Sequence, residues 1–268
     1  MKVVLIADVH SNIHALRAME AAEAPFDLVI CVGDLVDWGM DPKAAVDWLR
    51  QHPHVAVKGN HEGFVLSAAD NQKRVREGLP PVEGTYYVEE EPLGQETNFS
   101  TYTVNRLTAE DIEFLRAMPE STVVEVDGYC YYLQHTCPES KCDIVLEAMA
   151  GYSSQPLFDR LWREYAGRPE ISSCKRRIVN AHTHQCWMHQ VRGGALFMNP
   201  GSISNRCHSA DNLEPGADYI VIQDGVPQMK HITYPTDEIR QSIRDGHFTE
   251  QIRDIALRLF TPEENRAL

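Results

Sequence analysis

The sequence predicts an α/β sandwich in which two β-sheets pack face to face and helices cover their outer faces. Residues 1–60 show the pattern β-α-β-α-β, in which short apolar runs alternate with amphipathic segments. Further along, strand-like runs flank Asp127-Gly128 and Asp224-Gly225, which are dipeptides typical of hairpin turns. Strand–helix units followed by hairpins favour two packed sheets with helices outside them.

The N-terminal region contains three predicted strands, at residues 3–7, Leu28–Val32 and 55–57. The first two are continuous apolar runs, which indicates strands buried on both faces. Two amphipathic helices lie between the strands. The second of them begins at Asp41-Pro42, where a capping residue precedes a proline in the first helical turn.

The rest of the chain is predicted to complete one domain that spans residues 1–268. Hairpin strands are expected at 121–134, and further strands at 177–198 and 219–232. The segments 63–119 and 138–175 are less regular and are predicted to be insertions that form a cap or lid. Residues 235–268 form a tail that is predicted to be helical, with an amphipathic pattern from residue 237 to 260.

Composition and charge limit the classes of partner. The chain of 268 residues is 43% hydrophobic and 24% charged, as in ordinary globular proteins. A net charge of −14 argues against a nucleic-acid polymer as partner but allows a small phosphorylated substrate. No apolar run is long enough to span a bilayer, and Asp8 interrupts the N-terminal one, so we expect a cytoplasmic protein without a membrane partner.

Polar residues with metal-ligand chemistry follow each predicted N-terminal strand. They are Asp8-Val9-His10, Gly33-Asp34-Leu35-Val36-Asp37 and Gly59-Asn60-His61-Glu62, and later strands precede His135 and His182-Thr183-His184. Ligands bind open sheets at the carboxyl ends of their strands, so these residues are expected at one edge. Side chains two residues apart on an extended chain point the same way, so each of Asp-x-His and His-x-His can direct two ligands at one centre. Carboxylate, imidazole and amide ligands suit first-row transition metals.

Each motif alone has a simpler explanation. Asp-x-His arises by chance, Gly-Asp is common in turns, and a single histidine is more often a hydrogen-bonded core residue than a ligand. The interpretation as a metal site depends on the joint occurrence of all five elements, in order, each after a strand-like run.

Together these motifs resemble the signature of the calcineurin-like metallophosphoesterase superfamily, from residue 1 to about residue 232. Asn199-Pro200-Gly201-Ser202 further resembles its smaller bacterial and archaeal phosphodiesterase branch. The resemblance implies an α+β four-layer sandwich of two mixed sheets. It also implies hydrolysis of a small soluble phosphoester, a phosphodiester or nucleotide.

The resemblance also implies a role for each site residue. Two divalent transition-metal ions are expected, manganese first, with iron, zinc, nickel or cobalt as alternatives. The first ion would be held by Asp8, His10 and His184, the second by Asn60, His135 and His182, and Asp34 would bridge them. A water or hydroxide between the ions would attack phosphorus. His61 would protonate the leaving oxygen, and Asp37 would orient His61.

Several positions depart from the family pattern. Ala181 stands in place of the glycine before His182, and Thr136 in place of the glycine after His135. A phosphoprotein phosphatase and a dinucleoside polyphosphate hydrolase are the alternative enzyme functions. Serine/threonine protein phosphatases and symmetrical diadenosine tetraphosphatases carry a phosphate-binding arginine at the position of Trp38, and its absence here disfavours both alternatives. Arg206 is a candidate phosphate contact, or a solvated loop residue. A non-catalytic scaffold on the same fold is the alternative from a different functional class.

Overall fold

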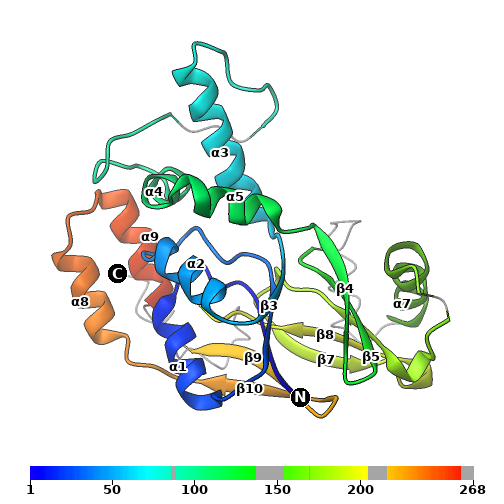
Figure 1. Ribbon diagram of the computed structural model, residues 1–268. Coiled ribbons are helices and arrows are strands. Elements are labelled where there is room, and N and C mark those ends of the chain that lie inside the picture. Colours follow the sequence, from blue (N-terminus) through cyan, green and yellow to red (C-terminus); the bar gives the residue numbers. More distant parts are fainter. Residues whose placement is uncertain (86–88, 137–153, 169, 205–215, 261–268) are drawn as a thin grey trace.

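The computed structural model describes residues 1–268 except 86–88, 137–153, 169, 205–215 and 261–268. Two five-stranded sheets pack face to face, and helices lie on both outer sides (Figure 1). The predicted fold class is therefore confirmed, with the layers in the order helix, sheet, sheet, helix.

The first sheet has the strand order β10-β9-β1-β2-β3. Its strands are β1 (Lys2–Ile6), β2 (Leu28–Val32), β3 (His54–Val57), β9 (Ala217–Gln223) and β10 (Val226–Ile232). Strands β1, β2 and β3 are parallel, whereas β9 is antiparallel to both β1 and β10. The crossover helices are α1 (Ile13–Glu23) and α2 (Pro42–Gln51). This topology brings the carboxyl ends of β1, β2 and β3 to one edge.

The second sheet has the strand order β4-β5-β6-β8-β7. Its strands are β4 (Ser121–Val126), β5 (Tyr129–Gln134), β6 (Arg176–Val179), β7 (Cys186–Gln190) and β8 (Leu196–Pro200). Strands β5, β6 and β8 are parallel, and β4 and β7 pair antiparallel at the two edges. Both hairpins predicted from Asp-Gly turns form, and each turn places its aspartate and glycine in left-handed conformation.

Three apolar clusters hold the layers together. Alternate residues of β1, such as Val3 and Leu5, face the second sheet and meet Tyr131 and Leu133 of β5. The other face of the first sheet packs on α1, α2 and the C-terminal helices. The outer face of the second sheet packs on α7 (Ser154–Leu161) and the π-helical turn Trp162–Ala166 that follows it. Alternation of apolar side chains along the strands therefore produces the four layers.

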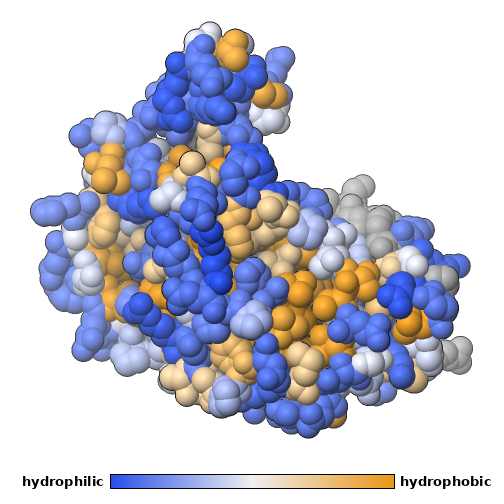
Figure 2. Space-filling model, viewed as in Figure 1, coloured by the Kyte–Doolittle hydropathy of each residue, from blue (hydrophilic) through white to orange (hydrophobic). Residues whose placement is uncertain are grey.

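The segment 63–119 contains more helix than its sequence indicates. The first helix, α3 (Asn60–Arg76), begins inside the Gly-Asn-His-Glu motif and projects from the body as an arm with a largely hydrophilic surface (Figures 1 and 2). Next come α4 (Phe99–Arg106) and α5 (Ala109–Ala117), the second of which is capped by the side chain of Thr108. Of the second predicted insertion, 138–175, the stretch 138–153 lies outside the described residues.

The C-terminal tail forms two helices rather than one continuous helix. These are α8 (Asp237–Asp245) and α9 (Glu250–Phe260), and the chain leaves helical conformation at Gly246 between them. Both pack against the N-terminal half of the molecule (Figure 1). Within the described ranges, no helix combines the length and apolarity needed to cross a membrane.

Candidate metal centre

The loops after β1 and β2 are tied to one another by main-chain hydrogen bonds. The Asp8 amide donates to the Gly33 carbonyl at 3.1 Å, and the His10 amide donates to the Asp34 carbonyl at 2.9 Å. These bonds hold the Asp-x-His segment beside the Gly-Asp segment at the sheet edge. The structure thus brings together the motifs of two strands that are separated by helix α1.

The first group of candidate ligands consists of Asp8, His10 and His184. The Nε2 atoms of His10 and His184 lie 3.2 Å apart, and His184 Nε2 lies 3.4 Å from Asp8 Oδ1. One ligand atom of each residue falls within 4.8 Å of the others. His10 is fully buried, and its burial lowers its pKa well below the usual range, which favours the neutral imidazole that metals bind.

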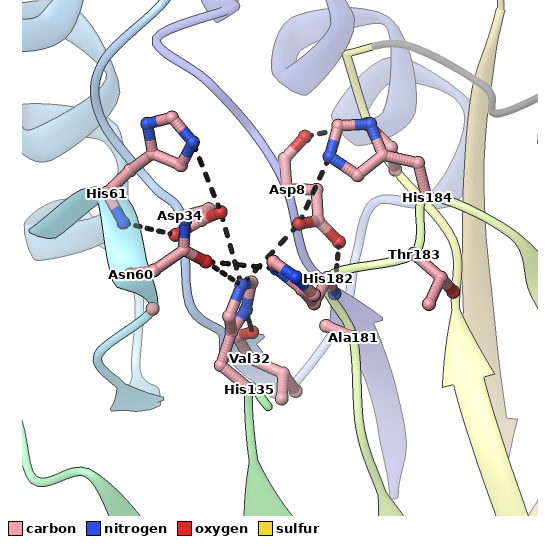
Figure 3. Close-up of polar contacts among 12 residues, drawn as sticks. Asp8, Val32, Asp34, Asn60, His61, His135, Ala181, His182, Thr183 and His184 are labelled. Atoms are coloured by element: carbon pink, nitrogen blue, oxygen red, sulfur yellow. Dashed lines mark hydrogen bonds and ion pairs between the residues drawn. The ribbon is translucent and has the colours of Figure 1, made fainter. Parts of the chain in front are cut away.

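The second group converges on the side-chain oxygen of Asn60. His135 Nε2 lies 3.1 Å and His182 Nδ1 lies 3.0 Å from Asn60 Oδ1 (Figure 3). His135 Nδ1 lies 2.7 Å from the Val32 carbonyl, which can only accept a hydrogen bond. That contact fixes the proton on Nδ1 and directs Nε2 at the centre, as second-layer contacts do in metal sites.

Asp34 lies between the two groups. Its Oδ2 atom is 3.1 Å from His135 Nε2 and 4.0 Å from the Nε2 atoms of His10 and His61. Burial is the largest single effect on Asp34 and opposes its ionisation, but the combined attraction of His135, His10 and His61 outweighs burial and holds the pKa of this carboxyl below its usual range. Burial is also the largest effect on His135, but Asp34, Asp8 and the Val32 carbonyl together outweigh it and raise the pKa of His135 to about 10.

The chemistry of these residues fits a pair of cations. Asp8 Oδ1 is buried and accepts no hydrogen bond from any described residue. His10 Nδ1 is also buried and has no hydrogen-bond partner among the described residues. The full set contains imidazoles, carboxylates and one amide oxygen, which are the ligands of first-row divalent metals.

His61 is paired with Asp37 beside the centre. His61 Nδ1 lies 2.9 Å from Asp37 Oδ2, and both side chains are buried. Burial lowers the pKa of His61, but the hydrogen bond to Asp37 and the charge of Asp34 outweigh it, so the pKa is raised overall. Ser100 Oγ donates to the same Asp37 oxygen at 3.3 Å. Sequence reasoning missed Ser100 because helix α4 was not predicted.

Glu62 is a further residue whose role the sequence analysis did not assign. Its carboxylate is fully buried and accepts hydrogen bonds from the backbone amides of Asp34, Leu35, Val36 and Gly59, at 2.7–3.2 Å. It therefore ties the loop after β2 to the loop after β3. The spacing of Gly59 and Glu62, a helix cap and its third residue, was the available signal.

The backbone at the site adopts left-handed conformations that L-residues rarely occupy. Positive φ angles of 46–73° occur at seven residues around the centre, namely Asp8, His10, Asp34, Asp37, Trp38, His182 and His184. Aspartate and histidine tolerate this conformation better than most residues, and such strain concentrates at functional sites.

The turn Asn199-Pro200-Gly201-Ser202 donates side-chain hydrogen bonds to the loops that carry the candidate ligands. Asn199 Nδ2 donates to the Ala181 carbonyl at 3.0 Å and to Thr183 Oγ1 at 3.1 Å, on both sides of His182. Ser202 Oγ donates to the Asp8 carbonyl at 2.8 Å. The Ala181 methyl lies in the apolar core between the sheets, which accommodates the alanine that replaces glycine.

A pocket of about 430 Å³ opens at this centre. Its lining includes four of the candidate ligands, both members of the His61–Asp37 pair, and residues from α4 and α9. A larger hollow of about 510 Å³ beside α1 and α8 contains none of the predicted site residues, so the chemistry favours the smaller pocket. Nine of the ten predicted site residues thus lie together, and Arg206 lies outside the described residues.

Comparison with known proteins supports the same family. Residues 1–214 match the family described as "Calcineurin-like phosphoesterase superfamily domain". The uncharacterized protein MJ0912 of Methanocaldococcus jannaschii is 33% identical over 66 residues, a match that covers 24% of this chain and only 27% of that relative.

Solved structures share the fold at low sequence identity. A metallophosphoesterase from Sphaerobacter thermophilus aligns with a TM-score of 0.62 at 18% identity, covering 96% of this chain and 99% of that one. The hypothetical protein PH1004 from Pyrococcus horikoshii aligns with a TM-score of 0.63 at 16% identity, covering 95% and 97%. With the match over residues 1–214, these findings show that the chain belongs to the calcineurin-like phosphoesterase superfamily.

Proposed function

We propose that the protein is a dinuclear-metal-dependent phosphodiesterase that hydrolyses a small soluble substrate. The observation that carries this proposal is the convergence of seven ligand-type side chains in two groups joined by Asp34. Asp8, His10 and His184 would hold one ion, Asn60, His135 and His182 the other, and Asp34 both. When bound, two such ions supply a nucleophile at neutral pH and neutralise charge on the phosphoryl oxygens.

The protein's own contribution to leaving-group departure comes from His61. Its raised pKa favours the imidazolium form, and Asp37 accepts the Nδ1 proton, so the Nε2 proton is held on the side that faces the centre. From there it can pass to the leaving oxygen as the ester bond breaks. Asp37 acts through His61 by fixing the orientation of the ring.

The lining of the pocket favours a diester over a more highly charged substrate. Among the described residues that line it, none is a lysine or an arginine, and Trp38 stands where some relatives carry arginine. A phosphodiester has one negative charge, which the metal ions can balance. A monoester dianion or a polyphosphate would bring further charge without a cationic side chain to receive it.

The test compares hydrolysis of bis(p-nitrophenyl) phosphate and p-nitrophenyl phosphate in Mn²⁺, with His61→Ala as control and with metal content measured. We expect faster diester cleavage, about two metal ions per chain, and a loss of about 10²–10⁴-fold in kcat for the variant, which is the usual size of an acid–base contribution. Faster monoester cleavage would replace the diesterase by a phosphatase. Bound metal without turnover of either ester would favour the scaffold.

A further inference from the structure

Three large apolar side chains, called the apolar wall below, line the candidate pocket. Trp38, Phe64 and Ile255 are each 37–39% exposed, although all three are large and hydrophobic. Ten large hydrophobic side chains among the described residues are exposed, and these three of the ten share one pocket. Apolar surface gathered in a concave site with a few polar groups is typical of a ligand-binding surface.

Two members of the wall, Trp38 and Phe64, lie directly against His61. The Trp38 ring centroid lies 4.5 Å from that of His61 at an interplanar angle of 68°, and the Phe64 ring lies at 5.4 Å and 75°. His61 is the group proposed to protonate the leaving oxygen. The part of a substrate that departs with that oxygen must therefore lie beside these two rings.

The position of Trp38 is maintained by an unfavourable backbone conformation. Its φ angle is +62°, in a region that bulky residues rarely enter. The next residue, Gly39, approaches the His10 carbonyl so closely that a Cβ atom there would lie 2.0 Å from its oxygen. This turn stacks the Trp38 ring on His10, with centroids 4.8 Å apart and an interplanar angle of 25°. Strain kept at a pocket wall points to a function of that wall.

The third member of the wall, Ile255, belongs to a part of the chain that is tied to the loop before α4. Ile255 lies on α9, and the loop before α9 is joined to the loop before α4 by a hydrogen bond from Thr249 Oγ1 to the Glu96 carbonyl. The buried Glu96 carboxylate in turn accepts from Arg106 Nη1 at 2.7 Å and from Asn105 Nδ2 at 3.0 Å. These contacts give this part of the pocket a preformed shape.

We propose that Trp38, Phe64 and Ile255 form a slot that selects phosphodiesters whose leaving group carries a planar aromatic ring, such as an aryl group or a nucleobase. This inference rests on the proposed phosphodiesterase function. Aromatic side chains bind a flat ring through stacked and edge-to-face contacts without specifying its polar groups. The absence of lysine and arginine from the described lining matches a leaving group of low charge.

The test uses two unsymmetrical diesters, methyl phenyl phosphate and methyl hexafluoroisopropyl phosphate. Their leaving alcohols have similar acidity, so the ratio of their kcat/KM values reports recognition rather than intrinsic reactivity. We expect wild-type protein to prefer the phenyl ester. Phe64→Ala should reduce that ratio about two- to tenfold, the size of one aromatic contact, and Ile255→Ser should reduce it by a similar factor because it removes apolar surface from the slot. Phe64→Leu keeps apolar volume without a ring and should reduce the ratio less.

The matched control is Val75→Ala, which removes an exposed apolar side chain from the same helix as Phe64 but outside the pocket. It should keep the wild-type ratio, and the metal content of every variant is measured so that a loss of metal is recognised. Equal kcat/KM for the two esters, or an unchanged ratio in both Phe64→Ala and Ile255→Ser, would overturn the inference about the slot and leave the proposed function standing. No turnover of either ester by metal-loaded wild type would overturn the proposed function, and the inference with it.

Discussion

Replacing Glu62 with glutamine should destabilise the protein by a large fraction of its total stability. Oε1 of Glu62 accepts from the amides of Leu35 and Val36, and Oε2 from those of Asp34 and Gly59. In either orientation, the glutamine NH₂ would face two backbone donors. Two buried N–H groups without acceptors cost about 2–6 kcal/mol together.

The charge of Glu62 reduces the loss of stability expected for Glu62→Gln. Burial raises the pKa of Glu62, so a neutral side chain avoids part of the cost of placing a carboxylate away from water. We therefore expect a loss of about 2–4 kcal/mol, against a total of about 5–15 kcal/mol for a typical domain. Metal content should fall as well, because the same bonds position the loops that carry Asp34 and Asn60.

Urea unfolding followed by circular dichroism measures the change in free energy of unfolding. The control is Glu77→Gln, since Glu77 is exposed at the C-terminal end of the same helix and its substitution should change stability by less than about 0.5 kcal/mol. A Glu62→Gln protein within about 1 kcal/mol of wild type would refute the reasoning, because two unsatisfied buried donors cannot be that inexpensive.

Three further predictions concern the centre and its surroundings. Asp37→Asn removes the carboxylate that raises the pKa of His61, so the alkaline limb of the kcat–pH profile should move to lower pH; an unmoved limb would argue against His61 as the acid. Gly59→Ala should abolish metal binding in a metal-content assay, because a Cβ atom there would lie 2.0 Å from Asp34 Oδ1; retained metal would show that the loop can shift. Glu96→Gln should destabilise the protein by about 1–3 kcal/mol in urea at neutral pH. Despite burial, hydrogen bonds lower the pKa of Glu96, so this contribution is present above its ordinary pKa of 4.5 and is lost as the pH falls below it; a pH-independent difference would contradict this origin.

The parts of the fold that the sequence predicts are those in which local signals agree with tertiary structure. The hairpin around Asp127-Gly128 forms with the expected strand bounds, because the turn chemistry and the apolar runs specify the same register. The metal motifs lie together because each directly follows a strand, and the parallel topology of β1, β2 and β3 brings those strand ends to one edge.

The parts that were missed depend on contacts distant in sequence. Helix α4 follows a region rich in proline and glycine and has only two turns. Its apolar residues therefore show no clear helical period in the sequence, and its packing on α3 is visible only in the structure. Ser100 reaches Asp37 only through that packing. Helix α3 extends to Arg76 on residues that are mostly polar, which a search for an apolar stripe overlooks. Gly246 divides the tail although the amphipathic pattern continues past it.

The left-handed backbone at the centre restricts how this site can change in evolution. Under the proposed function, a replacement at His10, Asp34 or His184 must meet two independent demands, for a metal-binding side chain and for a positive φ angle. Glutamate and cysteine are adequate ligands but are not among the residues enriched in this conformation, and β-branched residues are nearly excluded from it. Substitutions that keep the loops intact are thus largely limited to asparagine, aspartate, histidine and glycine. A homologue that binds no metal would still be expected to show this narrow set at the same positions, because the demand for a positive φ angle does not depend on a metal.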